Sequence, residues 1–96
     1  MSRCFIYPDV IAEIRSVCSH HLAGQASAAD MQRVIGRAEC AIAAIEENDI
    51  RDFLASAEGQ LERVRFTVDE AGLLPRIHEI ARTVMDWLLM REKDTA

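Results

Sequence analysis

Hydrophobic residues recur at steps of three and four along most of the chain, which is the spacing of one face of an α-helix. The first such segment begins near Pro8, a residue suited to a first helical turn because its missing N–H would be unpaired there anyway. Gly24 is expected to end this helix, since glycine adopts a left-handed C-cap conformation most easily. The apolar stripe consists of Val10, Ile11, Ile14, Val17, Cys18 and Leu22.

The second segment has a clear start, because Ser27 is a good N-cap and Asp30 follows three residues later. We expect this helix to extend as far as its last apolar position, Ile45. Asn48 or Asp49 should then end it and cap the next helix. The stripe consists of Met31, Val34, Ile35, Ala38, Ile42 and Ile45.

Two further helices are predicted in the second half of the chain. The third has its stripe at Ile50, Phe53, Leu54, Ala57, Leu61 and Val64. Residues 66–72 are expected to form a loop with one short extended segment. The fourth helix is predicted from around Pro75 to about Arg91, with its stripe at Ile77, Ile80, Ala81, Val84, Trp87 and Leu88. Residues 1–7 and the polar end, 92–96, are expected to fray.

Four amphipathic helices with short loops predict an all-α fold, a single-domain antiparallel bundle of about four helices spanning residues 1–96. Half of the residues are hydrophobic, which is enough for a globular core. No apolar run approaches the roughly 20 residues of a membrane-spanning helix, and the apolar part of residues 1–9 is too short for a secretory signal. Three cysteines without a CxxC pair indicate a reducing compartment, so we expect a cytoplasmic protein.

The net charge of −5 is concentrated in one part of the chain. Between Glu46 and Glu70 there are eight acidic residues and three arginines, which accounts for the whole −5, whereas the stretches before and after are each neutral. Such a concentration favours a basic protein partner and disfavours direct binding of nucleic acid. The alternative is a solvated face that serves solubility alone. The eight acids are Glu46, Glu47, Asp49, Asp52, Glu58, Glu62, Asp69 and Glu70.

The sequence predicts no metal, no cofactor and no catalytic motif of the common kinds. His20 and His21 are adjacent, so on a helix they point about 100° apart and cannot chelate one metal from one face. They and His78 are expected to be exposed or helix-end histidines. Zinc-binding spacings, phosphate loops and nucleophile elbows are all absent from the sequence.

One pair leaves an enzymatic alternative open. Arg15 and His20 are separated by four residues, a spacing similar to the arginine–histidine motif of the HEPN helical ribonucleases. In that family a polar residue follows the arginine, as Ser16 does here, but the pair lies late in the chain rather than in the first helix. A HEPN-like ribonuclease or its antitoxin is therefore the runner-up, and a plain helical adaptor is the third hypothesis.

Two stretches resemble the immunity proteins of the colicin D type and of contact-dependent growth inhibition systems. Residues 62–73, ERVRFTVDEAGL, resemble the family's acid–arginine pair, the aromatic residue three positions later, the acidic pair and the Gly-Leu before the last helix. Residues 22–31, LAGQASAADM, are similar to the family's junction of helix end, small residue, Ser/Thr-Ala, acid and apolar residue. The acidic run from Glu46 to Asp52 has no counterpart in that pattern.

The resemblance implies a cytoplasmic, non-enzymatic inhibitor. Members bind the C-terminal nuclease domain of a toxin, usually one that cleaves tRNA, and block its basic cleft with carboxylates. The motif carries Glu62, Asp69 and Glu70 as partner-binding residues. Charge alone adds Glu46, Glu47, Asp49, Asp52 and Glu58. Phe66 is predicted as either an interface anchor or a core residue, with core favoured; Trp87 is expected in the core.

Overall fold

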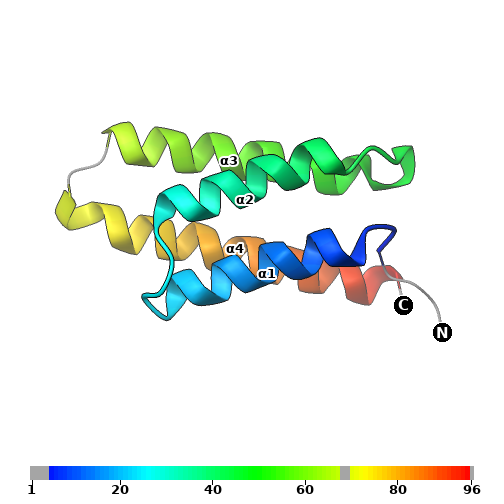
Figure 1. Ribbon diagram of the computed structural model, residues 1–96, viewed down its shortest axis with the longest axis horizontal. Helices are drawn as coiled ribbons and strands as arrows, with labels where there is room; N and C mark the ends of the chain where they lie inside the picture. The colour runs from blue at the N-terminus through cyan, green and yellow to red at the C-terminus, as the bar shows by residue number, and fades with distance from the viewer. Residues whose placement is uncertain (1–4, 68–69, 96) are drawn as a thin grey trace.

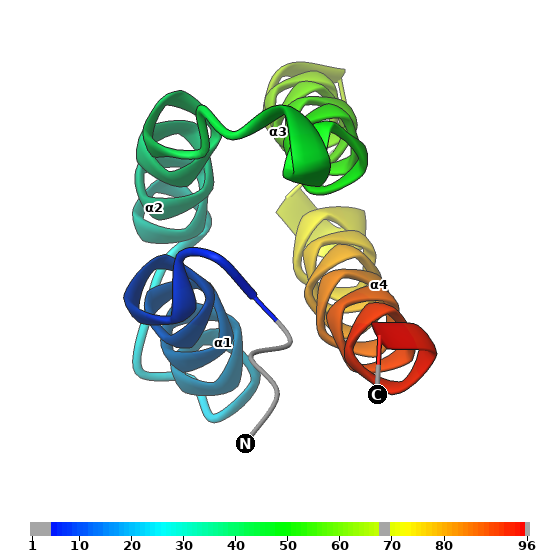
Figure 2. The same cartoon turned by 90° about the vertical axis from the view of Figure 1, so that its right-hand side faces the viewer.

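The computed structural model describes residues 5–67 and 70–95, and these form four α-helices and one short 3-10 turn. The elements are α1 (Pro8–Leu22), α2 (Ala28–Ala41), η1 (Ile45–Glu47), α3 (Asn48–Thr67) and α4 (Glu70–Thr95). Successive helices run in opposite directions along the long axis (Figure 1). Viewed end on, they occupy the corners of a square (Figure 2), and each helix packs on its two neighbours around it. The predicted all-α antiparallel bundle is confirmed.

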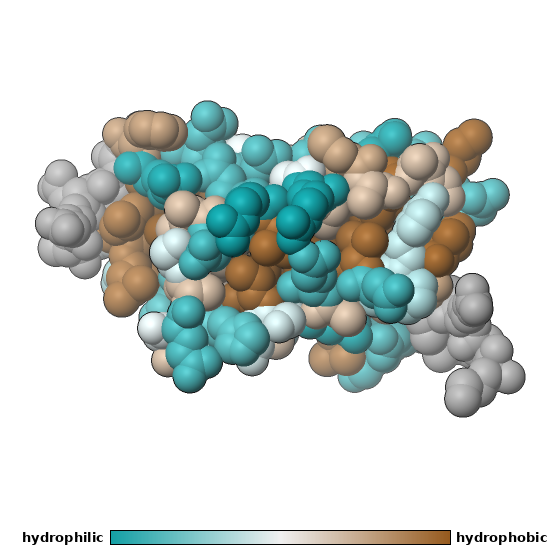
Figure 3. All heavy atoms as spheres, in the orientation of Figure 1, coloured by the Kyte–Doolittle hydropathy of each residue, from teal (hydrophilic) through white to brown (hydrophobic). Residues whose placement is uncertain are grey.

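The predicted stripes meet in one hydrophobic core. Its fully buried members come from all four helices and include Ile14, Ile35, Leu54 and Leu88, each with no exposed surface. On the side formed by α1 and α2, apolar side chains lie along the seam between the two helices, while polar side chains cover most of the rest (Figure 3). Trp87 is half-buried rather than fully buried, with its ring stacked on Phe53 of α3 at a centroid distance of 4.3 Å.

The junction between α1 and α2 forms as the sequence predicts. Pro8 opens α1, and Gly24 adopts a positive φ of 79° just after it ends. The side chain of Ser27 accepts a hydrogen bond from the Asp30 N–H at 3.1 Å, while the Asp30 carboxylate accepts one from the Ser27 N–H at 3.0 Å. These hydrogen bonds hold the pKa of Asp30 below its ordinary value.

The prediction that the second helix reaches Ile45 is wrong. The helix ends at Ala41, and Ile42 takes an extended conformation that keeps its side chain 1% exposed in the core. Ile45 lies in η1 with 80% of its surface exposed. A helix continued to residue 45 would be about 6 Å longer. The chain instead turns at Ile42 and crosses to α3, which begins at Asn48 as predicted.

The connection between α3 and α4 is shorter than predicted. Phe66 and Thr67 are helical, so the loop and the extended segment expected there are wrong for these two residues, while Val68 lies outside the described residues. α4 begins at Glu70, and Pro75 is its sixth residue rather than its first. Proline at that position lacks the N–H that would bond to the carbonyl four residues earlier, so the first turns of α4 lose one backbone hydrogen bond there.

The described residues at both ends of the chain contact the bundle or remain helical, whereas their expected fraying stays a prediction. Phe5 is 6% exposed in the core, and the Ile6 N–H donates a hydrogen bond of 2.9 Å to Oε2 of Glu47. At the other end, α4 remains helical to Thr95. The Arg15 guanidinium lies 5.6 Å from the Phe5 ring centroid and pairs with Glu92 of α4 at 3.0 Å. Residues 1–4 and 96 lie outside the described residues.

Replacement of Ser27 by alanine should lower the free energy of unfolding by about 1 kcal/mol, because the Asp30 N–H then loses its hydrogen-bond acceptor. Urea unfolding followed by circular dichroism measures this loss. Ser56→Ala is the control, since Ser56 is exposed in the middle of α3 and alanine suits a helix. Equal destabilisation by both substitutions would show that the cap contributes nothing specific.

Candidate protein-binding face

The acids expected to form one face are distributed over several sides of the bundle. Glu46 is exposed in η1, and Asp52 is exposed on α3. Asp49, in the first turn of α3, accepts a hydrogen bond of 2.7 Å from Nε of Arg91 on α4, so part of its charge is neutralised within the protein. Asp49 and Asp52 are three residues apart and share one side of α3, but the pairing of Asp49 with Arg91 reduces the negative charge there.

Glu47 does not belong to the surface, since only 2% of it is exposed. Its Oε2 accepts the hydrogen bond from Ile6, and its Oε1 is buried without a hydrogen-bond partner. Its role in the described structure is to hold the N-terminal segment against η1. The sequence gives no sign of this role, because Glu47 stands in an acidic run that is otherwise solvated.

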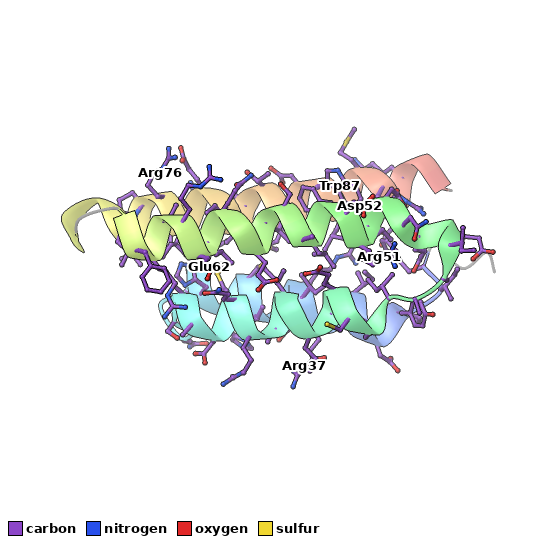
Figure 4. The ribbon with its side chains drawn as sticks, turned by 90° about the horizontal axis from the view of Figure 1, so that it is seen from above. Arg37, Arg51, Asp52, Glu62, Arg76 and Trp87 are labelled. Atoms are coloured by element: carbon purple, nitrogen blue, oxygen red, sulfur yellow. The ribbon has the colours of Figure 1, made fainter. Side chains whose placement is uncertain are left out.

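Three acidic side chains come close together between α2 and α3. Gly36 of α2 has no side chain, and Glu58 of α3 occupies the space beside it, with its Cδ 3.5 Å from the position that a Cβ on Gly36 would take. Glu58 lies close to Glu39 of α2, and Glu62 follows one turn later on α3. We call Glu39, Glu58 and Glu62 the carboxylate groove. Figure 4 shows Glu62 in the gap between the two helices.

The electrostatics of Glu58 reflect this crowding. Partial burial, its interaction with the nearby Glu39 carboxyl and the negative charges of Glu39 and Glu62 all raise its pKa above the ordinary value. A raised pKa means that the carboxylate form is less stable here than in water. A positive group placed in the groove would reverse that effect.

Four arginines border the groove, and none forms an ion pair with its three carboxyls within the described residues. Arg33 pairs with Asp30 at 3.2 Å, Arg37 pairs with Glu13 of α1, and Arg65 donates to the side chain of Gln32. Arg51 lies in the same gap (Figure 4), but seven residues before Glu58, which is about 10 Å along the helix axis. A shallow cleft of about 400 Å³ opens beside Gly36 and Glu58. Arg33, Arg37 and Arg65 line this cleft together with Glu58, so basic side chains border the carboxylates, although no ion pair joins them to Glu39, Glu58 or Glu62 within the described residues.

The remaining predicted partner-binding residues belong to the end of α3 and the start of α4. Phe66 is helical and 77% exposed, so the favoured core assignment is wrong. The position of Phe66 on the helix explains its exposure, because it lies about 160° around α3 from the buried Ile50. Asp69 lies outside the described residues. Glu70 is the first residue of α4, and its side chain also lies outside them.

Arg15 and His20 do not converge on a common point. Five positions along an α-helix place their side chains about 140° apart. Arg15 pairs with Glu92, whereas the exposed His20 is hydrogen-bonded through Nδ1 to Ser16 at 3.3 Å. The pair therefore does not form a compact site in this conformation.

His21 is a structural histidine that the sequence does not identify. It is 2% exposed, so the expectation of an exposed residue is wrong, although its place at the end of α1 is as predicted. Its Nδ1 is hydrogen-bonded to the Ala26 carbonyl at 2.9 Å, and its ring meets His78 edge to face at 4.8 Å.

Within residues 5–67 and 70–95, no three potential ligands gather to hold a metal ion. No helix in those ranges is long and apolar enough to cross a membrane.

The described cysteines have different surroundings. Burial raises the pKa of the Cys18 thiol to about 11, so this thiol stays protonated at neutral pH. Cys40, on α2, is exposed. Neither is disulfide-bonded, and Cys4 lies outside the described residues.

The raised pKa of Glu58 predicts a pH dependence of stability. The folded state binds this proton more tightly than the unfolded chain does, so stability should fall as pH rises from the ordinary glutamate value of 4.5 through the raised one. Glu58→Gln should remove this part of the slope and make the protein more stable than wild type at pH 7. Urea unfolding between pH 4 and pH 8 measures both effects. The exposed Glu46→Gln should keep the wild-type slope, and an unchanged slope in Glu58→Gln would contradict the assignment.

Comparison with known proteins gives no relative: no family model matches the chain, and neither a curated protein nor a solved structure matches it. Its function must therefore be inferred from its own surface and charge.

Proposed function

We propose that this protein is a non-enzymatic inhibitor, an immunity protein that binds the C-terminal nuclease domain of a bacterial toxin and blocks its basic, RNA-binding cleft. The observation that carries this proposal is the carboxylate groove between α2 and α3. Its three carboxyls crowd together, and within the described residues none of them forms an ion pair with the arginines that border the groove. Such a surface gains most from a partner that supplies positive charge.

The chemistry of the partner follows from the substrate of a ribonuclease. A cleft that binds RNA must be electropositive, because it neutralises phosphates with lysine and arginine side chains. Fixed carboxylates can take the place of those phosphates, since arginine pairs with both groups through the same parallel hydrogen bonds. The net charge of −5 also speeds the approach of a basic partner.

Two further observations support an inhibitor over the alternatives. Residues 62–73, which carry the resemblance to colicin D-type immunity proteins, include Glu62 of the groove and Phe66 beside it. The ribonuclease alternative depends on Arg15 and His20, whose side chains diverge around α1. The adaptor alternative does not account for three carboxyls held together in one groove. We therefore favour one-to-one binding to a toxin in the cytoplasm.

Titration calorimetry against the C-terminal domain of the polypeptide encoded immediately upstream tests this proposal. We expect tight one-to-one binding that weakens between 50 and 500 mM salt, because screening shortens the reach of exposed charges from roughly 14 Å to about 4 Å. Replacing both Glu58 and Glu62 by glutamine should weaken binding by about ten- to a hundredfold.

The matched control removes two exposed acids from α4, as Asp86→Asn with Glu79→Gln. This control should bind within about twofold of wild type, because both substitutions lie on α4, which does not border the groove between α2 and α3. Failure of the wild-type protein to bind at either salt concentration would refute the proposed function. Cleavage of RNA by the pure protein, lost in His20→Ala, would establish the enzymatic alternative instead.

A further inference from the structure

Phe66 is the largest apolar side chain that the described structure leaves mainly in water. It stands in the last turn of α3 with 77% of its surface exposed. Single exposed hydrophobic residues are common on protein surfaces. The position of this one within α3 makes it informative, because it ends a regular series of outward-facing residues.

That series runs along the outer edge of α3. Ala55, Gly59, Glu62 and Phe66 follow one another at steps of four, three and four, so they share one side of the helix. All four are exposed, and Asp52 extends the same side by one turn toward the start of α3. We call these five residues the outer edge of α3. Figure 4 views α3 from outside the bundle, with Glu62 toward α2 and Asp52 toward α4.

Along the outer edge of α3, the side chains are small in the middle and large at one end. A Cβ added at Gly59 would meet no atom within 4 Å, so nothing in the described protein covers this turn. Ala55 adds only a methyl group. Phe66 therefore projects beyond a shallow stretch of helix whose backbone another protein can approach closely.

The charge along the edge indicates what kind of protein could approach. Asp52 and Glu62 are exposed, and neither forms an ion pair with another residue of the described part of the chain. Glu62 also belongs to the carboxylate groove, and the exposed Arg63 and Arg65 flank it on α3, so the acidic residues of the edge are Asp52 and Glu62 alone. A second copy of this chain would place further negative charge beside Asp52 and Glu62, whereas a basic partner would neutralise them.

From this arrangement we infer that the outer edge of α3 is a docking surface for a protein with an apolar pocket rimmed by basic side chains. Phe66 fills the pocket and Glu62 pairs with its rim, while Asp52, about 21 Å farther along the helix axis, pairs with basic side chains beyond the pocket. An aromatic side chain that is exposed in the free protein and enclosed in a complex is the usual form of an interface anchor. The inference rests on the proposed function, and it assigns the hydrophobic part of that interface to one residue.

Binding of the toxin nuclease domain to substituted full-length proteins tests this inference. Phe66→Ala should weaken binding by at least tenfold, and Phe66→Leu should lose less because it retains most of the apolar volume. The control is Leu74→Ala on α4, since Leu74 is also well exposed, at 55%, but lies off the outer edge. It should bind within about twofold of wild type.

A second variant separates binding from folding. Gly59→Gln favours the helix and meets no internal obstacle, so its stability should equal or exceed that of wild type. Its longer side chain should nevertheless keep the partner away and weaken binding by at least tenfold. Thermal unfolding of each variant confirms that the loss is not a loss of fold.

The outcomes distinguish the two proposals. Tight binding by wild type that is unchanged in both Phe66→Ala and Gly59→Gln would overturn the docking surface and leave the inhibitor function standing. Absence of binding by wild type would refute the inhibitor function, and the docking surface with it. Loss of affinity in both variants, with Leu74→Ala unaffected, is the result that we expect.

Discussion

The bundle depends on the meeting of four apolar stripes in a single core. A chain of this size buries only about 60–65% of the surface that it exposes when unfolded, so each stripe must be used almost completely. Residues such as Ile14, Ile35, Leu54 and Leu88 accordingly have no exposed surface. This requirement fixes the rotation of every helix, and it thereby decides which residues of α3 face α2, which face α4 and which face outward.

The acidic surface is a consequence of that fixed rotation. Once Leu54 and Leu61 point into the core, Glu58 and Glu62 must lie on the side of α3 that faces α2. The missing side chain of Gly36 lets Glu58 settle close to α2, and there it meets Glu39. The repulsion among these carboxyls opposes folding, and the burial of the stripes outweighs it. Uncompensated charge of this kind suits binding better than it suits stability.

The sequence predicts those parts of the structure that depend on local chemistry. Apolar periodicity identifies four helices, and the capping box formed by Ser27 and Asp30 marks the start of α2. Each of these signals is contained within a few neighbouring residues. The sequence predicts the burial of a residue less well where that burial depends on a contact with a residue distant in the chain. Glu47 is buried because Ile6, 41 residues away, offers it an N–H, and His21 is buried beneath the loop carbonyl of Ala26 and against His78. The charge pattern locates α3 as the acidic element, but only the packing shows that Glu58 and Glu62 share a groove while Asp49 pairs with Arg91.

The even number of antiparallel helices places residues 5 and 95 at the same end of the bundle (Figure 1). Tension applied between the two ends of the chain would therefore act across the seam between α1 and α4, opening it one turn at a time instead of sliding whole helices past each other. The first contacts to bear the load would be those of Phe5, of Ile6 with Glu47, and of Arg15 with Glu92. An unfolding enzyme that pulls on one end of the chain would meet its main resistance at these contacts. Once they break, the helices would separate one after another.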